Sequence, residues 1–234
     1  MGMHTLEEAR AEMLQGITPL PTETIPLSQA GSRVLATEAQ AKIDLPRFDN
    51  SAMDGYAVRA DEANTGAKLK CIGEVPAGSV FEGELGVGEC LRIFTGSPMP
   101  DGANAVVMQE DTHADGDLIE ITDGVKPFEH IRLLGEDLKA NETIGHSGER
   151  LHAGRLQLLG AAGVAEVSVH RQPIVGVLST GDELCEPGED LGAGSIYESN
   201  RAALAELIHQ GGAEPRVYPL VRDTLETTVE ALKT

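Results

Sequence analysis

The sequence predicts a multidomain α+β protein, in which a mainly β domain is inserted within a small linker domain and followed by the first part of an α/β domain with a parallel sheet. Two changes of pattern predict this fold class. Short β-rich runs separated by Gly, Pro, Asn and Asp occupy residues 41–141, whereas residues 172–234 alternate strand and helix in the order βαβα. We expect the linker domain, with an N-terminal helix, at residues 1–40 and 142–171.

An amphipathic helix of about three turns is expected near the start of the chain. Thr5 and Glu8 have the spacing of a capping box, in which each side chain bonds the backbone N–H of the other residue. Gly16 and Pro19 then end the pattern. The apolar residues between these signals recur at helical spacing: Leu6, Ala9, Met13 and Leu14.

The inserted domain is predicted from runs of strand-forming residues that are bounded by turn residues. Asp115-Gly116 is typical of a hairpin turn, and we expect it to join the run that ends at Met108 to the run that starts at Leu118. The runs are Tyr56–Val58, Leu69–Ile72, Cys90–Phe94, Val106–Gln109 and Leu118–Ile121.

Two polar side chains stand where runs of this domain meet loops. Asp54 belongs to an Asp-Gly turn directly before residues 56–58, and Thr95 ends an apolar run ahead of a Gly- and Pro-rich loop. Loops that carry polar groups off rigid strands are where binding sites are built. The alternative is purely structural, with Asp54 as a turn residue and Thr95 as a β-branched residue at a strand end.

The second half of the linker domain is predicted to contain one helix and one strand. Residues 156–165 are apolar and typical of a short helix, and they lead into a strand at Glu166–Val169. We expect Val34–Ala36, from the other side of the insertion, to pair with this strand.

The last third is predicted to form a strand at 174–178, a helix at 199–209, a strand at 216–221 and a helix from residue 224. A right-handed crossover places the two strands parallel in one sheet. Parallel sheets are buried on both faces, and sheets usually hold about five strands. We therefore expect a fragment that lacks the rest of this domain. The alternative is a closing helix that needs no further strands.

Polar residues follow both strands of this sheet, at the edge where open α/β sheets bind ligands. Ser199 or Asn200 is the expected N-cap of the intervening helix, with free N–H groups pointing to the same edge. Such an edge suits an anionic ligand held through a hard cation such as Mg²⁺. Structural explanations stay open, since Asp182 can shape a turn and Asp223 can cap a helix. The residues after the strands are Ser179, Thr180, Gly181, Asp182 and Glu183, then Arg222 and Asp223.

Composition argues against several partners. The 234 residues include 38 acidic and 18 basic ones, and the net charge of −20 repels nucleic acids and anionic membranes. Cys71, Cys90 and Cys185 are widely spaced, which is typical of reduced, buried thiols in the cytosol. The start of the chain has no signal-peptide core, and the most apolar window is too short to span a bilayer. We expect a cytoplasmic protein with no nucleic-acid or membrane partner.

Several motifs occur in a fixed order: FDNSAMDGYA at 48–57, RIFTGSP at 92–98, AVVMQE at 105–110, GED at 135–137, STGDEL at 179–184, IYESNR at 196–201 and VRD at 221–223. Together they resemble the molybdopterin molybdenumtransferases, the MoeA family, which also includes the E domain of gephyrin. The resemblance covers essentially the whole chain.

The resemblance implies an enzyme that inserts molybdate into adenylylated molybdopterin and releases AMP, with Mg²⁺ required. It implies catalytic roles for Asp54, Thr95, Asp137, Glu183 and Asp223. Among these, Asp54, Glu183 and Asp223 are the implied metal-binding residues. The implied cofactor-binding residues are Ser179, Thr180, Gly181, Asp182, Ser199, Asn200 and Arg201.

The resemblance also implies a homodimer, whose cleft joins the β domain of one subunit to the α/β domain of the other, and a molybdopterin adenylyltransferase as upstream partner. Family members are longer, so we expect a C-terminally truncated chain that is poorly active alone. Leu133 and Leu134 stand where the family usually has basic residues, which lowers the expected anion affinity of that loop. Two alternatives are a non-catalytic dimeric scaffold of the same fold and a Mg²⁺-dependent phosphohydrolase.

Overall fold

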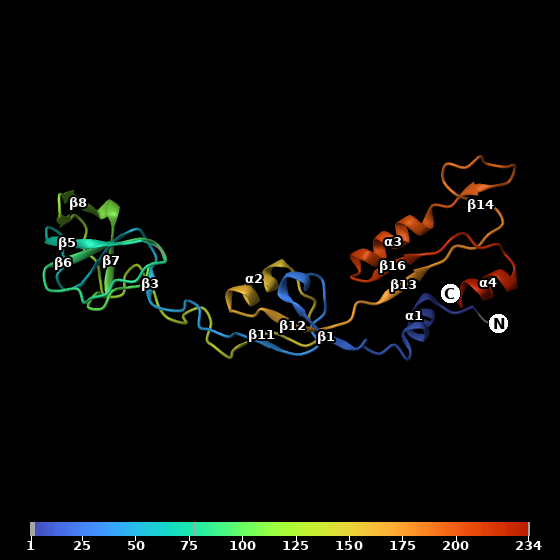
Figure 1. The fold of residues 1–234 in the computed structure, drawn as a ribbon, viewed down its shortest axis with the longest axis horizontal. Coiled ribbons are helices and arrows are strands. Elements are labelled where there is room, and N and C mark those ends of the chain that lie inside the picture. The colour runs from blue at the N-terminus through green and yellow to red at the C-terminus, as the bar shows by residue number, and fades with distance from the viewer. Residues whose placement is uncertain (1–2, 77, 234) are drawn as a thin grey trace. The chain divides into compact units, whose positions relative to one another are not determined.

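The computed structural model describes residues 3–76 and 78–233 (Figure 1). The chain forms two compact units, and each is described by itself. The first comprises Met1–Glu38, His146–Leu156 and Glu166–Thr234, and the second comprises Ala39–Gly145 and Gln157–Ala165. Helices and strands are mixed along the chain, so the predicted α+β fold class is confirmed. The expected boundaries of the three domains stay a prediction.

A six-stranded mixed sheet forms the body of the second unit (Figure 1). Its strands lie in the order β7-β4-β6-β5-β9-β8, and every neighbouring pair is antiparallel except β5 with β6. Each predicted run overlaps one of these strands. The strands are β4 (Gly55–Val58), β5 (Lys68–Val75), β6 (Glu89–Ile93), β7 (Ala105–Met108), β8 (Thr112–Asp115) and β9 (Leu118–Ile121).

Apolar side chains cover both faces of this sheet. Successive residues of a strand point to opposite faces, and Cys90 belongs to one buried cluster while the adjacent Leu91 belongs to another. Val107 and Val106 of β7 divide between the two clusters in the same way. Burial on both faces explains why β7 is a continuous apolar run in the sequence, without alternation of polar and apolar residues.

The hairpin prediction was right about the turn and wrong about one of its strands. Gly116 has the positive φ of +60° that a tight hairpin turn requires, but the turn joins β8 to β9. β7 pairs with β4 at the other side of the sheet. The reason is a short 3₁₀ helix, η2 (Gln109–Asp111), which redirects the chain between β7 and β8.

Two short antiparallel strand pairs of the second unit flank this sheet in the sequence. β2 (Ala39–Gln40) pairs with β11 (Thr143–Gly145), and β3 (Asn50–Ser51) pairs with β10 (Ile131–Arg132). The β3–β10 pair matters most for the site, because Asp54 follows β3 and Asp137 follows β10.

In the first unit, β1 (Thr22–Pro26) pairs antiparallel with β12 (Glu166–His170). Val34–Ala36 pairs with β12 as expected, since Leu35 makes an antiparallel bridge to Val169 and Ala36 N donates to the carbonyl of Ser168 at 2.9 Å. The segment is too short to form a strand of its own. β1 escaped prediction because Ile25 is its single large apolar residue and proline ends it. A 3₁₀ helix, η1 (Leu27–Gln29), follows β1.

Both helices predicted in the first two-thirds of the chain are present. α1 (Leu6–Leu14) starts with the predicted capping box, in which Glu8 N donates to Thr5 Oγ1 at 3.2 Å and Thr5 N donates to Glu8 Oε2 at 2.8 Å. α2 (Ala153–Ala161) begins and ends earlier than the predicted 156–165. It stops there because Gly163 adopts a φ of +81°, a left-handed conformation that commonly ends helices.

The α/β part follows the predicted order of elements. β13 (Ile174–Val177) and β16 (Glu214–Val217) are parallel, as expected, with α3 (Asn200–Gln210) between them in the sequence and α4 (Leu225–Ala231) after them. The second strand is earlier than the predicted 216–221, since Pro219 has no N–H to continue the pairing. A parallel pair of two-residue strands, β14 (Leu184–Cys185) and β15 (Ile196–Tyr197), was not predicted.

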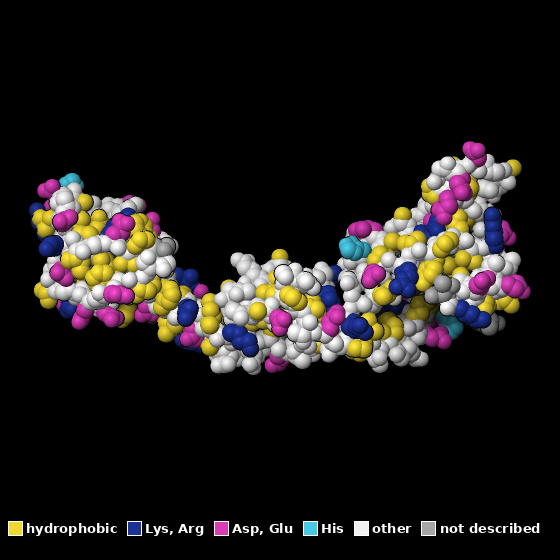
Figure 2. All heavy atoms as spheres, in the orientation of Figure 1, with side chains coloured by type: hydrophobic (Ala, Val, Ile, Leu, Met, Phe, Trp, Pro, Cys, Tyr) yellow, Lys and Arg dark blue, Asp and Glu magenta, His cyan; other side chains and the backbone are white. Residues whose placement is uncertain are grey.

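Several hydrophobic side chains of this part are open to solvent, as Figure 2 shows for one face. Ile174 of β13 and Leu207 of α3 are 54% and 62% exposed. The three thiols are free, but only Cys90 is buried, so the expectation of buried thiols is wrong for Cys71 and Cys185. None of the helices in the described part of the chain has the length and apolarity needed to cross a membrane.

Candidate functional site

The structure brings Asp54 and Thr95 together although they are distant in sequence. Asp54 directly precedes β4 and Thr95 follows β6, and these neighbouring strands are antiparallel. Asp54 Oδ1 accepts hydrogen bonds from the backbone N of Thr95 at 2.8 Å and from its Oγ1 at 2.9 Å. Both residues are exposed. Within the residues that the structure describes, Asp54 Oδ2 receives no hydrogen bond, so it can bind a ligand.

Hydrogen bonding holds the Asp54 carboxylate in its charged form. The backbone N–H of Thr95 and then its hydroxyl lower the pKa of Asp54 below the usual aspartate value, with a smaller contribution from the charge of Arg92. Desolvation works in the opposite direction and is outweighed. Asp54 is therefore an anion at neutral pH.

Arg92 supports this pair and was not identified from the sequence. Its guanidinium carbon lies 5.2 Å from the ring centre of Tyr56 and 4.9 Å from that of Phe94, within cation–π range. Nη1 donates to the carbonyl of Gly55 at 2.9 Å, and Nη2 donates to Gln109 Oε1 at 2.5 Å. Arg92 thus holds the backbone next to Asp54. The signal in the sequence is the two-residue spacing of Arg92 and Phe94, which puts both side chains on one face of a strand and so allows them to stack.

Thr95→Val is expected to raise the pKa of Asp54 toward its usual value. Valine keeps the shape of threonine and its backbone N–H but removes the hydroxyl donor, which favours the charged carboxylate. Arg92→Gln should raise the pKa less, because the charge of Arg92 is the weaker cause. Titration of the Asp54 carboxyl carbon by NMR measures both shifts. An unchanged pKa in Thr95→Val would show that the hydroxyl does not bond Asp54 in solution.

Asp137 lies on a separate loop of the same unit. Arg132 Nε donates to Glu136 Oε1 at 2.7 Å, and Arg132 also forms an ion pair with Asp137. Among the contacts of residues 3–76 and 78–233, none joins Asp137 directly to Asp54 or Thr95. Two carboxylates of this loop thus engage Arg132, and its anion affinity stays a prediction.

The ends of the two parallel strands gather a second polar group in the other unit. Thr180 and Val221 form a parallel bridge beyond β13 and β16. Asp182 Oδ1 accepts from the backbone N of Asp223 at 3.3 Å, and the carbonyl of Asp182 accepts from Arg222 Nη1 at 3.0 Å. The side chains of Asp182, Arg222 and Asp223 are exposed. The strand topology therefore brings together residues about forty positions apart, as the rule for open α/β sheets predicts.

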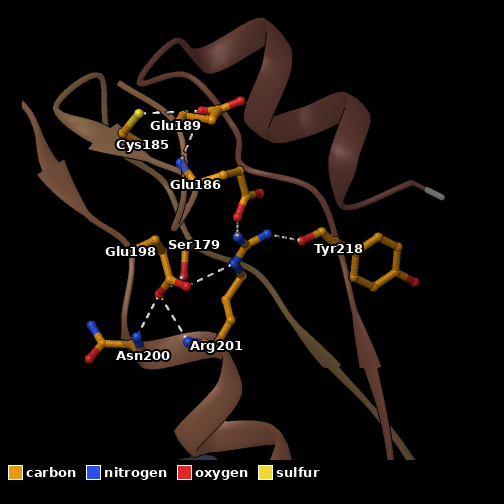
Figure 3. Close-up of polar contacts among 8 residues, drawn as sticks. All are labelled: Ser179, Cys185, Glu186, Glu189, Glu198, Asn200, Arg201 and Tyr218. Carbon is orange, nitrogen blue, oxygen red and sulfur yellow. Dashed lines mark hydrogen bonds and ion pairs between the residues drawn. The ribbon is translucent and has the colours of Figure 1, made fainter. Parts of the chain in front are cut away.

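Ser199, one of the two predicted residues, is the N-cap of α3, but the capping hydrogen bonds are made by the side chain of Glu198 (Figure 3). Its Oε1 accepts from the backbone N of Asn200 at 2.7 Å and of Arg201 at 2.9 Å, and from Ser179 Oγ at 3.2 Å. Ser199 occupies the N-cap position without a side-chain capping bond. The expectation of free N–H groups at this edge is therefore wrong for Asn200 and Arg201, because the longer Glu198 side chain reaches them first.

Arg201 is buried and bonded to protein groups in three directions (Figure 3). Nε donates to Glu198 Oε2 at 3.0 Å, Nη1 to the carbonyl of Tyr218 at 2.8 Å, and Nη2 to Glu186 Oε2 at 2.5 Å. These contacts tie α3 to the segment after β16, and the cofactor-binding role expected for Arg201 stays a prediction. Glu198 and Glu186 were missed, although the Glu-x-x-Arg spacing at 198–201 indicates an ion pair within one helical turn.

One guanidinium, that of Arg201, pairs with two carboxylates in this network. Burial works to raise the pKa of Glu198, but the hydrogen bonds from the Arg201 side chain, from two backbone N–H groups and from Ser179 outweigh it and lower the pKa. Hydrogen bonds to Glu186 and Glu198 raise the pKa of Arg201. Glu198 and Arg201 therefore stay ionised at neutral pH.

Arg201→Met is expected to destabilise the α/β part by about 3 kcal/mol, because removing one member of a buried ion pair leaves the other charge unbalanced. Urea unfolding followed by circular dichroism measures the loss. Arg216→Met is the matched control, since Arg216 is exposed on β16 and forms no ion pair within the described residues. Equal stability of the two variants would contradict a structural role for Arg201.

No group of three or more His, Cys, Asp or Glu side chains that could hold a metal ion is found in residues 3–76 and 78–233.

Comparison with known proteins places both parts of the chain. Residues 4–163 match the family model described as the MoeA N-terminal region (domain I and II), and residues 176–234 match the probable molybdopterin binding domain. The molybdopterin molybdenumtransferase of Haemophilus influenzae is 41% identical over 211 residues, which cover 89% of this chain and 52% of the relative. That of a Nostoc species is 40% identical over 207 residues, 86% of this chain and 48% of the relative.

A crystal structure of the molybdopterin biosynthesis moeA protein from Pyrococcus horikoshii matches with a TM-score of 0.84 and 36% identity, over 97% of this chain and 62% of that one. The chain thus spans about half the length of the curated relatives that it matches.

Proposed function

The chain belongs to the MoeA family, and we propose that it takes part in molybdenum cofactor biosynthesis, in the insertion of molybdate into adenylylated molybdopterin with release of AMP. The observation that carries this proposal is the Asp54–Thr95 pair. An anionic carboxylate with one unbonded oxygen, beside a hydroxyl, can bind a cation and orient an oxyanion.

We propose Mg²⁺ as the cation, held by Asp54, Glu183 and Asp223. Mg²⁺ is usually bound through one or two carboxylates together with substrate phosphates and waters. The exposed Asp54 fits this mode. When bound, Mg²⁺ would neutralise charge on the phosphate groups.

Residues of the α/β edge would bind the pterin nucleotide. Ser199 and Asn200 are exposed at the start of α3, where Ser179 bonds Glu198. Thr180, Gly181 and Asp182 lie between β13 and β14. Asp137 would act from the loop after β10. Arg201 would serve this proposal by positioning α3, since three of its N–H groups bond protein groups.

We further propose that the protein works as a cytoplasmic homodimer and receives its substrate from a molybdopterin adenylyltransferase. In such a dimer Asp54 and Thr95 of one chain would act with Glu183 and Asp223 of the other. Mixing an Asp54→Asn protein with a Glu183→Gln protein should then restore part of the activity. No restoration would show that the residues act within one chain.

The deciding experiment supplies adenylylated molybdopterin, Mg²⁺ and molybdate and follows AMP release. The assay is run on the full-length protein from its natural source and on the 234-residue chain. AMP release that depends on molybdate supports the insertase. Release without molybdate would instead indicate a phosphohydrolase, and no release from the full-length protein would indicate a scaffold.

A further inference from the structure

Cys71 of β5 and Cys90 of β6 lie opposite each other across a parallel strand pair. They are direct register partners. Neighbouring strands of a sheet lie about 4.8 Å apart, and the Cα atoms of disulfide-bonded cysteines are usually about 4.4–6.8 Å apart. The backbone register therefore brings the two residues within disulfide distance.

Both thiols lie on the same face of the sheet. Cys90 is fully buried in the apolar cluster that contains Val58 and Ile119, and Cys71 packs against that cluster. Burial, together with the charge and hydrogen bond of the neighbouring Cys71, raises the pKa of Cys90 to about 12. The two sulfur atoms are therefore neighbours, as the backbone register of the two residues already suggests.

The two thiols differ in access to solvent. Cys71 lines an open hollow of about 500 Å³ together with Tyr56, Glu74 and Arg92, and its Sγ lies 3.3 Å from the carbonyl oxygen of Gly73. Cys90 is 0% exposed. A small oxidant therefore reaches Cys71 first, and Cys90 only through Cys71.

We propose that Cys71 and Cys90 are a site of reversible oxidation, at which a peroxide closes a disulfide between β5 and β6. The Cys71 sulfur attacks one peroxide oxygen, the O–O bond breaks, and the thiol proton leaves with the departing hydroxide as water. The Cys90 sulfur then attacks the sulfenic sulfur of Cys71. The S–S bond forms, the S–O bond breaks, and the hydroxyl leaves with the Cys90 proton as water.

In total, two thiols are oxidised to one disulfide, and one peroxide is reduced to two molecules of water. A small-molecule thiol reverses the step by thiol–disulfide exchange. The high pKa of Cys90 keeps it almost entirely protonated at neutral pH, so we expect its attack to be the slow step and to accelerate as pH rises.

The test treats the reduced, folded chain with hydrogen peroxide, blocks the remaining thiols by alkylation and maps the peptides by mass spectrometry. The free thiols should fall from three to one per chain, with Cys71 linked to Cys90 and Cys185 alkylated. Dithiothreitol should restore all of them. Cys185→Ser is the matched control and should form the same link, whereas Cys71→Ser should lose it.

Three results would overturn the proposal: oxidation of Cys71 to sulfinic acid without a link, pairing of either cysteine with Cys185 or between chains, or a link that forms as fast in urea as in the folded chain. The last result would show that the sheet register does not matter. The peptide map of the unmodified sequence decides the question without any cysteine variant, so a variant that fails to fold does not affect the test.

Discussion

Asp54→Asn is expected to lower molybdate-dependent AMP release by the full-length protein by about 100-fold or more, in the range that follows loss of one electrostatic group from an active site. Asparagine can still accept the two hydrogen bonds from Thr95, so the turn before β4 should keep its geometry. It cannot supply the negative charge that a divalent cation needs. The initial rate of AMP release measures the effect.

Asp123→Asn provides the matched control for this variant. Asp123 is an exposed aspartate of the same unit, and its side chain makes no hydrogen bond within the described residues. Its replacement removes the same charge and should leave the rate unchanged. A rate for Asp54→Asn that equals the control would remove Asp54 from the proposed chemistry.

The strands could be predicted wherever burial left a long apolar run. β6 and β7 are covered on both faces, so their composition identifies them without any knowledge of their neighbours. The pairing of β7 could not be predicted in the same way. It depends on η2, whose Gln-Glu-Asp sequence gives no helix signal, and on a partner, β4, that lies far back in the chain.

The polar groups were predictable where topology alone brings them together. The parallel strands β13 and β16 force Asp182 and Asp223 to one edge whatever their side chains do. Capping propensity predicted the start of α3 at Ser199 or Asn200. It did not predict that Glu198 makes the capping bonds, because Glu198 is held there by Arg201, with which it pairs in the fold. Side-chain competition of this kind is not visible in single-residue preferences.

Gly55→Ala is expected to destabilise the six-stranded sheet by about 3 kcal/mol or more, at or above the upper end of the usual cost of overpacking. A Cβ at this position would lie 1.9 Å from the carbonyl oxygen of Val107. β4 is hydrogen-bonded to β6 on one side and to β7 on the other, so it cannot move away from one neighbour without strain against the second. Urea unfolding of Gly55→Ala, compared with that of a control variant, measures the loss of stability.

Gly73→Ala is the control, because Gly73 lies in β5 of the same sheet and its added Cβ would only reach ordinary contact with Leu91 Cδ1 at 3.6 Å. Equal stability of the two variants would contradict the close approach of β4 and β7. The comparison also separates two roles of adjacent residues: Gly55→Ala should lose activity in step with unfolding of the sheet, whereas Asp54→Asn should lose it in a folded protein. Asp54 would then owe its position to the glycine beside it and its effect on the reaction to its charge.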